Sequence, residues 1–234
     1  MKNGLFGAYA MMLCLSFTPA AAQQAIFTPI LTTAENFRDI AGIAASTGGT
    51  GFANTTSNFG VMRTGIFYRS NALSLSNADW ATLSSLRIGR DIDLRTPDEI
   101  SAALDTVPAG AIYTNINVVG TSNLPSPALS AVTMDALLSY GQNGYRTFVT
   151  DPVEQSGFRT VLLTLAHDPG PDLFHCSLGK DRTGWTAVLL ESIAGVSSAT
   201  IQNDYLASNT YLAGTINAQT AALVAAAPAL EGMD

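Results

Sequence analysis

Short apolar segments alternate along the chain with longer segments of helical periodicity. Apolar or alternating runs predict strands at 65–70, 91–95 and 172–175, and each is followed by apolar residues recurring at every third or fourth position. Strands that alternate with helices in this way are typical of a layered α/β fold. We therefore predict one central, mainly parallel sheet flanked by helices. Further strands are predicted at 25–30, 61–63 and 111–119.

The predicted helices begin at recognisable capping residues. Ser76 can cap a helix over 77–87, and Pro97 can open another whose first turn carries Asp98 and Glu99. The segment near residue 40 is expected to pair with the strand at 65–70. The remaining helical patterns lie at 128–140, 143–150, 156–167, 185–194, 199–208 and 211–226.

The first 22 residues have the features of a secretory signal peptide. Lys2 supplies a positive start, residues 5–17 are apolar, and Ala20-Ala21-Ala22 offers a small-residue cleavage site before Gln23. The apolar run is too short to span a bilayer, so we expect no stable membrane insertion. The predicted location is therefore outside the cytoplasm, periplasmic or secreted.

Residues 23–234 are expected to form a single domain, because no linker or repeat divides them. Within this domain the segment 44–60 is rich in Gly, Ser, Thr and Asn, which predicts a flexible surface loop. The chain ends abruptly at 231–234 after an alanine-rich helical pattern. This end is consistent with either a native C-terminus or a truncated one.

Composition restricts the class of partner. The chain has 47% hydrophobic and only 12% charged residues, with a formal net charge of −7. Loss of Lys2 with the signal peptide would move that charge to −8. A chain this acidic is poorly suited to nucleic acid or to an anionic membrane surface. The mature chain would keep one cysteine, Cys176, which excludes an internal disulfide.

The surroundings of Cys176 predict an anion-binding loop. The cysteine follows the strand at 172–175, and Arg182 lies six positions later at the start of a helical pattern. A loop between a strand and a helix can turn its N–H groups inward, and the helix N-terminus adds more unpaired N–H groups. Five residues between Cys176 and Arg182 are enough to surround one phosphate. This C-x5-R spacing predicts a cysteine-dependent phosphatase.

Each residue of this loop has an expected role. A thiolate at Cys176 would attack phosphorus, while Arg182 would hold two phosphate oxygens in a forked contact. Thr183 could donate its hydroxyl to the sulfur and help it leave the phosphocysteine intermediate. No metal or cofactor is required. The substrate-binding positions are Ser177, Leu178, Gly179, Lys180 and Gly184.

Three other interpretations of the loop are weaker. A nucleotide-binding P-loop needs a glycine at 174 and a hydroxyl residue after Lys180, and the chain has Phe174 and Asp181 instead. A zinc site would have only His167 and His175 to add to Cys176. A buried structural cysteine does not explain the surrounding glycines, arginine and threonine.

The motifs together resemble the secreted bacterial tyrosine phosphatase family, of the atypical dual- or triple-specificity type. The matches follow family order over most of the mature chain, but Ala41 replaces a glycine and the 44–60 segment is longer than expected. The family also tends to continue with more helix beyond this chain's end. The matching segments are N-F-R-D-I-A-G at 36–42, F-Y-R-S-N-A-L at 67–73, D-I-D-L-R-T-P-D-E at 91–99, H-C-S-L-G-K-D-R-T-G at 175–184 and D-Y-L-A-S-N at 204–209.

The resemblance implies a tyrosine-phosphatase-like fold and activity on phosphotyrosine, with phosphoserine, phosphothreonine or phosphoinositides as further substrates. Lys180 would extend the range by meeting a second phosphate. Its alternative role is an ion pair with Asp181. Asp181 is also the first candidate for the general acid, as the family implies, because neither tryptophan belongs to a W-P-D triplet.

Asp93 is the second candidate for the general acid, because it ends a strand at the edge where α/β sheets bind ligands. Its alternative role is a structural link to Arg38 or Arg95. Arg38, Arg69 and Arg95 are expected to be framework residues, with Asn36 and Asp39. His175 should point away from the loop and act as an orienting residue.

Two other functions remain open for the same loop. A phytase-like enzyme acting on inositol phosphates would favour a basic pocket, whereas the mature chain would have only 10 Lys and Arg residues. A non-catalytic binder of phosphate or phosphoproteins would not need the intact cysteine, arginine and threonine.

Overall fold

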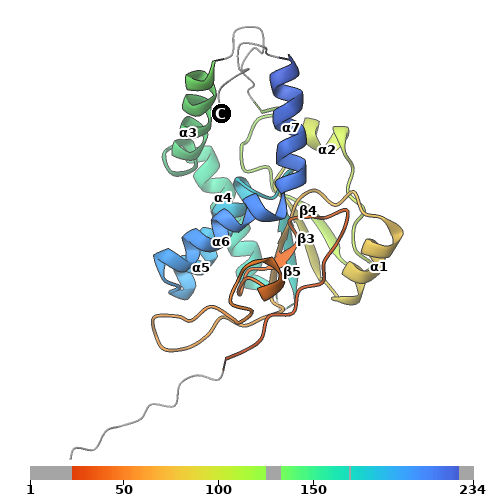
Figure 1. Cartoon of the computed structure of the whole chain (residues 1–234), viewed down its shortest axis with the longest axis vertical. Helices are drawn as coiled ribbons and strands as arrows, with labels where there is room; N and C mark the ends of the chain where they lie inside the picture. The colour runs from red at the N-terminus through yellow and green to blue at the C-terminus, as the bar shows by residue number, and fades with distance from the viewer. Residues whose placement is uncertain (1–22, 125–132, 169, 227–234) are drawn as a thin grey trace, which may run out of the picture.

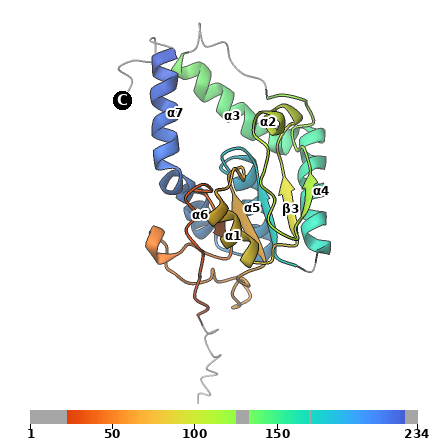
Figure 2. The same cartoon turned by 90° about the vertical axis from the view of Figure 1, so that its right-hand side faces the viewer.

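The computed structural model describes residues 23–124, 133–168 and 170–226. The predicted signal peptide and the last residues of the chain lie outside these ranges, as does the expected start of a helix near 128. A five-stranded sheet forms the centre of the molecule, with helices on both faces and along one end (Figures 1 and 2).

The sheet has the strand order β1-β2-β5-β3-β4, and only the pairing of β1 with β2 is antiparallel. This arrangement confirms the α/β class, the mainly parallel sheet and the predicted pairing near residue 40. β5 is the central strand, so its carboxyl end lies between those of two parallel neighbours. The strands are β1 (Arg38–Asp39), β2 (Phe67–Ser70), β3 (Arg90–Asp93), β4 (Ile112–Asn115) and β5 (Asp172–His175).

Alternate residues of the central strand enter two separate cores, because successive side chains of a strand point to opposite faces. Phe174 packs with Ile92 and with apolar residues of α3, α4 and α5 on one face. Leu173 packs with Tyr68 and with Leu83 of α1 on the other. Both β5 residues are fully buried, which fixes the position of the loop that follows.

The helices are α1 (Asn77–Ser85), α2 (Pro97–Ala102), α3 (Met134–Thr150), α4 (Pro152–His167), α5 (Arg182–Ala194), α6 (Ser198–Tyr211) and α7 (Ala213–Ala226), with a short 3-10 helix, η1 (Ala45–Thr47). The predicted cap of α1 is present, since the Ser76 side chain accepts from the Asp79 N–H. Thr96 and Glu99 form a capping box at the start of α2. Glu99 is therefore fixed in position at both its backbone and its side chain.

Several predicted boundaries were wrong, and the strand expected at 61–63 is reduced to one bridge, between Thr55 and Val61. α3 continues through Gly141 and Gly144, where two helices were expected; both glycines are exposed, and the packing of Tyr145 and Phe148 offsets their low helix propensity. The expected strand at 25–30 is reduced to one bridge between Ala25 and Phe52. The strand expected at 111–119 is limited to the four residues of β4.

The segment 44–60 has little regular structure, as its composition predicts, yet it is attached to the domain at several points. The Asn54 N–H donates to the Ala41 carbonyl, and its side-chain amide donates to Glu191 of α5. A bridge also joins Thr56 to Val196. The segment therefore packs against α5 and the loop that follows it.

Beyond the carboxyl end of the strands lie α3 and α7, which approach each other at the end away from the sheet and diverge toward it (Figures 1 and 2). They touch through Leu137 of α3 and Leu223 and Val224 of α7. Within the described ranges, no helix has both the length and the apolar character needed to cross a membrane.

Candidate active site

The candidate site is the loop of residues 176–182, called here the cysteine loop, between β5 and α5. Cys176 follows the last residue of the central strand, and Arg182 is the first residue of α5. Gly179 has a φ of +66°, and a Cβ placed there would lie 2.1 Å from the Ser70 carbonyl oxygen. Only glycine can therefore occupy this turn.

Neighbouring side chains hold the carbonyl groups of the cysteine loop. The Asn36 amide donates to the carbonyls of Leu178 and Gly179, at 3.0 and 2.9 Å, and Arg69 Nη2 donates to Gly179 at 2.9 Å. Among the described residues, no N–H of 177–182 donates to a backbone carbonyl. Since the N–H and C=O groups of a peptide point in opposite directions, the anchored carbonyls leave these N–H groups free to bind an anion.

Arg182 is held in place by Glu99, a residue to which the sequence analysis gave no role. Its Nη1 and Nη2 donate to the two carboxylate oxygens of Glu99 at 2.7 and 2.6 Å, and the Ser177 hydroxyl donates to the same carboxylate at 2.5 Å. Burial favours the neutral form of Glu99, but the hydrogen bonds from Arg182 and Ser177 lower its pKa to about 2. Glu99 is therefore ionised at neutral pH and fixes the guanidinium.

This contact leaves the other edge of the guanidinium available. The Nε–H and the second Nη2–H of Arg182 have no acceptor among the described residues. Those two groups lie on the edge that can bind two phosphate oxygens in a fork. Arg182 is only 7% exposed, so such a contact would form in a largely dry environment.

A network of buried charged side chains connects the cysteine loop to α6. Asp204 of α6 accepts from Arg38 Nε at 3.2 Å and from Arg69 Nη1 at 2.9 Å, and all three side chains are buried. Burial alone would raise the pKa of Asp204, but the two arginines outweigh it and lower that pKa. Arg38 also donates to Asn36 at 2.5 Å. The predicted framework residues Arg38, Arg69 and Asn36 thus connect α6 to the carbonyls of the cysteine loop.

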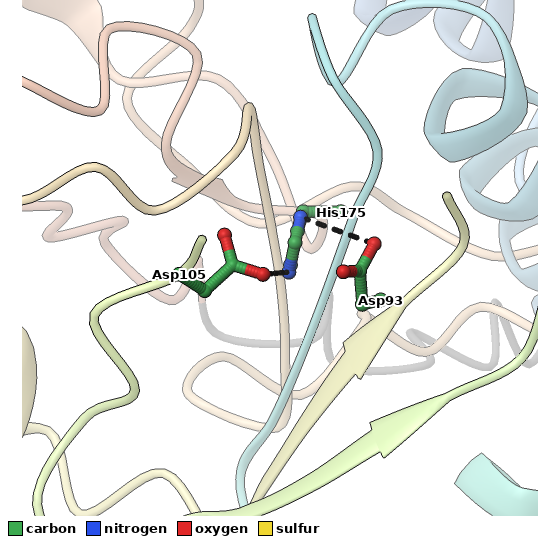
Figure 3. A group of neighbouring side chains, drawn as sticks. All are labelled: Asp93, Asp105 and His175. Carbon is green, nitrogen blue, oxygen red and sulfur yellow. Dashed lines mark ion pairs between the residues drawn. The ribbon is translucent and has the colours of Figure 1, made fainter. Parts of the chain in front are cut away.

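Asp93 lies in a separate acidic cluster, drawn in Figure 3. The structure favours a structural link to Arg95 over a catalytic role for Asp93. The Asp93 side chain is fully buried and accepts hydrogen bonds from Arg95 Nε and Nη2 at 2.9 and 2.8 Å. Burial raises its pKa, but Arg95 and the charge of His175 lower it to a larger extent. An ionised, enclosed carboxylate has no proton to give at neutral pH.

His175 is surrounded by acids of this cluster. Its Nε2 lies 3.2 Å from Asp91 and 3.5 Å from Asp105, and its Nδ1 lies 4.0 Å from Asp93 (the last two contacts are shown in Figure 3). The Asp91 contact is an ion pair without hydrogen-bond geometry. Burial lowers the pKa of His175, but these carboxylates raise it to about 9. The imidazole is therefore protonated at neutral pH and unsuited to act as a base.

The same cluster is the one place in the described ranges where metal-ligand atoms converge. One atom each from Asp93, Asp105 and His175 lies within 4.8 Å of the others. Arg95 already pairs with both carboxylates, at 2.8 and 2.5 Å, and the protonated His175 has no lone pair to offer. The residues therefore do not fit a metal ion.

The other predicted loop residues have different surroundings in the structure. Cys176 is 2% exposed and is a free thiol. The Thr183 hydroxyl is buried without a hydrogen-bond partner, so the expected contact with the sulfur is not made in this structure. Lys180 forms no ion pair with Asp181 or with any other described acid, which removes that alternative. Gly184 lets Tyr205 approach, since a Cβ there would lie 2.7 Å from its ring.

Asp181 faces an open cavity beside the loop. The cavity has a volume of about 560 Å³, and Asp181 and Arg182 lie on its wall together with Tyr145 and Phe148 of α3. The Tyr145 hydroxyl donates to Asp181. Of the two predicted acids, Asp181 is therefore the one with access to a bound molecule. The sequence analysis missed Tyr145, because no local motif links residue 145 to the loop.

Comparison with known proteins gives one family. The sequence model of the tyrosine phosphatase family matches residues 29–231. A tyrosine-protein phosphatase of Nostoc commune is 34% identical over 143 residues, 60% of this chain and 47% of its own length. The triple specificity protein phosphatase PtpB of Mycobacterium tuberculosis is 31% identical over 204 residues, 76% of this chain and 68% of its own.

Among solved structures, TpbA of P. aeruginosa aligns over 84% of this chain and 91% of its own, with 18% identity and a TM-score of 0.34. The chain spans about half the length of the Nostoc protein and about two thirds of PtpB. The family match nevertheless extends from β1 to beyond α7 and includes the whole cysteine loop. The chain belongs to the tyrosine phosphatase family.

Proposed function

We propose that this protein is a cysteine-dependent phosphatase that hydrolyses phosphotyrosine through a phosphocysteine intermediate. The observation that carries the proposal is the cysteine loop, where Cys176 and the free N–H groups share one turn with the open edge of Arg182. Family membership agrees with this chemistry. Nucleophile, anion cradle and cationic clamp are the three parts that phosphoryl transfer to a thiolate needs.

The reaction proceeds in two steps. In the first, the Cys176 thiolate forms a bond to phosphorus as the bond to the tyrosine oxygen breaks, and Asp181 gives its proton to that oxygen. In the second, water attacks the phosphocysteine, Asp181 takes a proton from the water, and the thiolate leaves. Arg182 and the loop N–H groups bind the equatorial oxygens throughout. Inorganic phosphate and tyrosine are the products.

The cavity beside Asp181 supports an aryl phosphate as substrate. Its wall includes the rings of Tyr140, Tyr145 and Phe148, which suit the ring of a phosphotyrosine. Lys180 supports a wider range, because an ammonium group with no ion pair to a described acid can bind a second phosphate. Phosphoinositides are therefore the second substrate class, and phosphoserine and phosphothreonine are weaker substrates without a ring to bind.

A substrate panel tests this proposal. The purified protein, assayed with a chelator present, should release phosphate faster from a phosphotyrosine peptide than from the matched phosphoserine peptide. Turnover of inositol hexaphosphate should be slower still, because the chain as a whole carries more acids than bases, with a formal net charge of −7. A clear preference for inositol hexaphosphate would favour the phytase-like alternative, and tight binding of the peptides without turnover would favour a non-catalytic binder.

Export is proposed from residues 1–22 alone. The positive start, apolar run and small residues before Gln23 support cleavage and a periplasmic or secreted location. In a bacterial host the protein should be recovered outside the cytoplasm with Gln23 as its first residue. Recovery from the cytoplasm with residues 1–22 still attached would contradict the proposal, and mass spectrometry of the intact chain distinguishes the two.

A further inference from the structure

We infer that Tyr145 of α3 is a positioning residue for Asp181, an inference that rests on the proposed function. The Tyr145 hydroxyl donates to Asp181 Oδ1, and it also contacts the hydroxyl of Tyr205 from α6. Tyr145 lies 36 residues before Asp181 and reaches it from α3, and Tyr205, 24 residues after Asp181, reaches Tyr145 from α6. They orient the proposed general acid toward the cavity.

The conformation of Asp181 provides independent support. It occupies the N-cap position of α5, where an aspartate normally accepts from an N–H of the first helical turn. Its side chain makes no such bond, and its backbone has φ −87° and ψ −72° instead of the extended conformation found at the caps of α1, α2 and α3. Its carboxylate is directed to Tyr145 in place of the helix.

Tyr145 is itself held rigidly. Its ring packs edge-on against Phe148 at 5.6 Å, and Phe148 packs in the same way against Phe158 of α4 at 5.1 Å. Tyr205 lies against Gly184, where any larger residue would displace its ring. The hydroxyl that contacts Asp181 is therefore fixed by the core on one side and by α5 on the other.

The directions of the hydrogen bonds follow from the groups involved. The Tyr145 hydroxyl has one hydrogen, which it donates to Asp181 Oδ1, so in the contact between the two tyrosines the Tyr205 hydrogen goes to the Tyr145 oxygen. Burial, and then the hydrogen bond to Asp181, raise the pKa of Tyr145, which keeps it a neutral donor. With Oδ1 accepting from Tyr145, the catalytic proton of Asp181 belongs on Oδ2.

Substrates with different leaving groups test this role. Tyr145→Phe keeps the ring and removes only the hydroxyl. It should lower kcat/KM, which reports the transfer of the phosphoryl group to Cys176, by about 10-fold for phenyl phosphate, whose poor leaving group needs a proton; this is a fraction of what a full general acid contributes. For 2,4-dinitrophenyl phosphate, whose leaving group needs no proton, kcat/KM should change by less than about 2-fold.

Two further variants complete the experiment. Asp181→Asn should show a larger loss with the same dependence on the leaving group, and adding Tyr145→Phe to it should have no further effect. Tyr211→Phe removes a hydroxyl that contacts Thr47, away from the loop, and should leave both rates unchanged.

Equal losses on both substrates, or a further loss in the double variant, would overturn the positioning role while leaving the proposed function intact. Failure of the wild-type protein to turn over either substrate would overturn both. The unfolding midpoint of Tyr145→Phe, measured alongside, should lie within a few degrees of wild type.

Discussion

Replacing Cys176 by serine is expected to reduce turnover of a phosphotyrosine peptide by about 10³-fold or more. A serine hydroxyl at this position would be protonated at neutral pH, whereas the thiolate is the nucleophile that the loop is built to hold. The N–H groups of residues 177–182 and the open edge of Arg182 would remain in place. Phosphate release by the purified variant, compared with wild type under the same conditions, gives the result.

The affinity for inorganic phosphate distinguishes a variant that has lost only the chemical step from one that has lost the phosphate-binding site. Cys176→Ser should still bind inorganic phosphate within a few-fold of the wild-type affinity, because the cradle is unchanged. Arg182→Lys should lose both binding and turnover, since a lysine cannot contact Glu99 and fork onto phosphate at the same time. Turnover that persists in Cys176→Ser would rule out the phosphocysteine mechanism.

Replacing Asp204 by asparagine is expected to reduce the free energy of unfolding by about 3 kcal/mol or more. Asp204 is the shared partner of Arg38 and Arg69, and the substitution would leave two buried guanidinium groups without their counter-charge. Turnover should also fall, because Arg69 holds the Gly179 carbonyl. Denaturant titration measures the first effect and the substrate assay the second.

Asp135→Asn provides the matched control, since Asp135 is an exposed acid in the first turn of α3. Its effect on stability should stay within about 0.5 kcal/mol. Glu191 would limit the damage in Asp204→Asn: burial, and then the charge of Asp204, raise its pKa to about 9, so it would ionise more easily once that charge is gone. A loss below about 1 kcal/mol would show that the two arginines do not depend on Asp204.

Much of the fold follows from local patterns. The strand that ends at His175 contains the buried apolar pair Leu173 and Phe174, and α1 and α2 begin at the residues that their caps predict. The predicted helix boundaries were wrong where tertiary packing outweighed the helix propensity of the local sequence. Gly141 and Gly144 indicated a break, but Tyr145 and Phe148 stabilise one continuous α3 through contacts that the local sequence does not contain.

The partners of the site residues were harder to predict than the site itself. Glu99 stands in a motif noted from the sequence, but its role depends on a contact with Arg182 across 83 residues. Asp105 approaches His175 through a loop with no recognisable signal. Asp93 illustrates the reverse case, because its position at a strand end left a catalytic and a structural role open, and its hydrogen bonds from Arg95 favour the structural one.

The sequence alone determined the cysteine loop: Cys176 and Arg182, their spacing, and the glycine at 179 are fixed by chemistry that acts within ten residues. Only the tertiary structure decided how those groups are held. Asn36 and Arg69 anchor the loop carbonyls, Glu99 orients Arg182, and Tyr145 contacts Asp181. Each of these is a contact between distant elements of the sheet and helices, and a local pattern contains no information on which distant side chain will meet it.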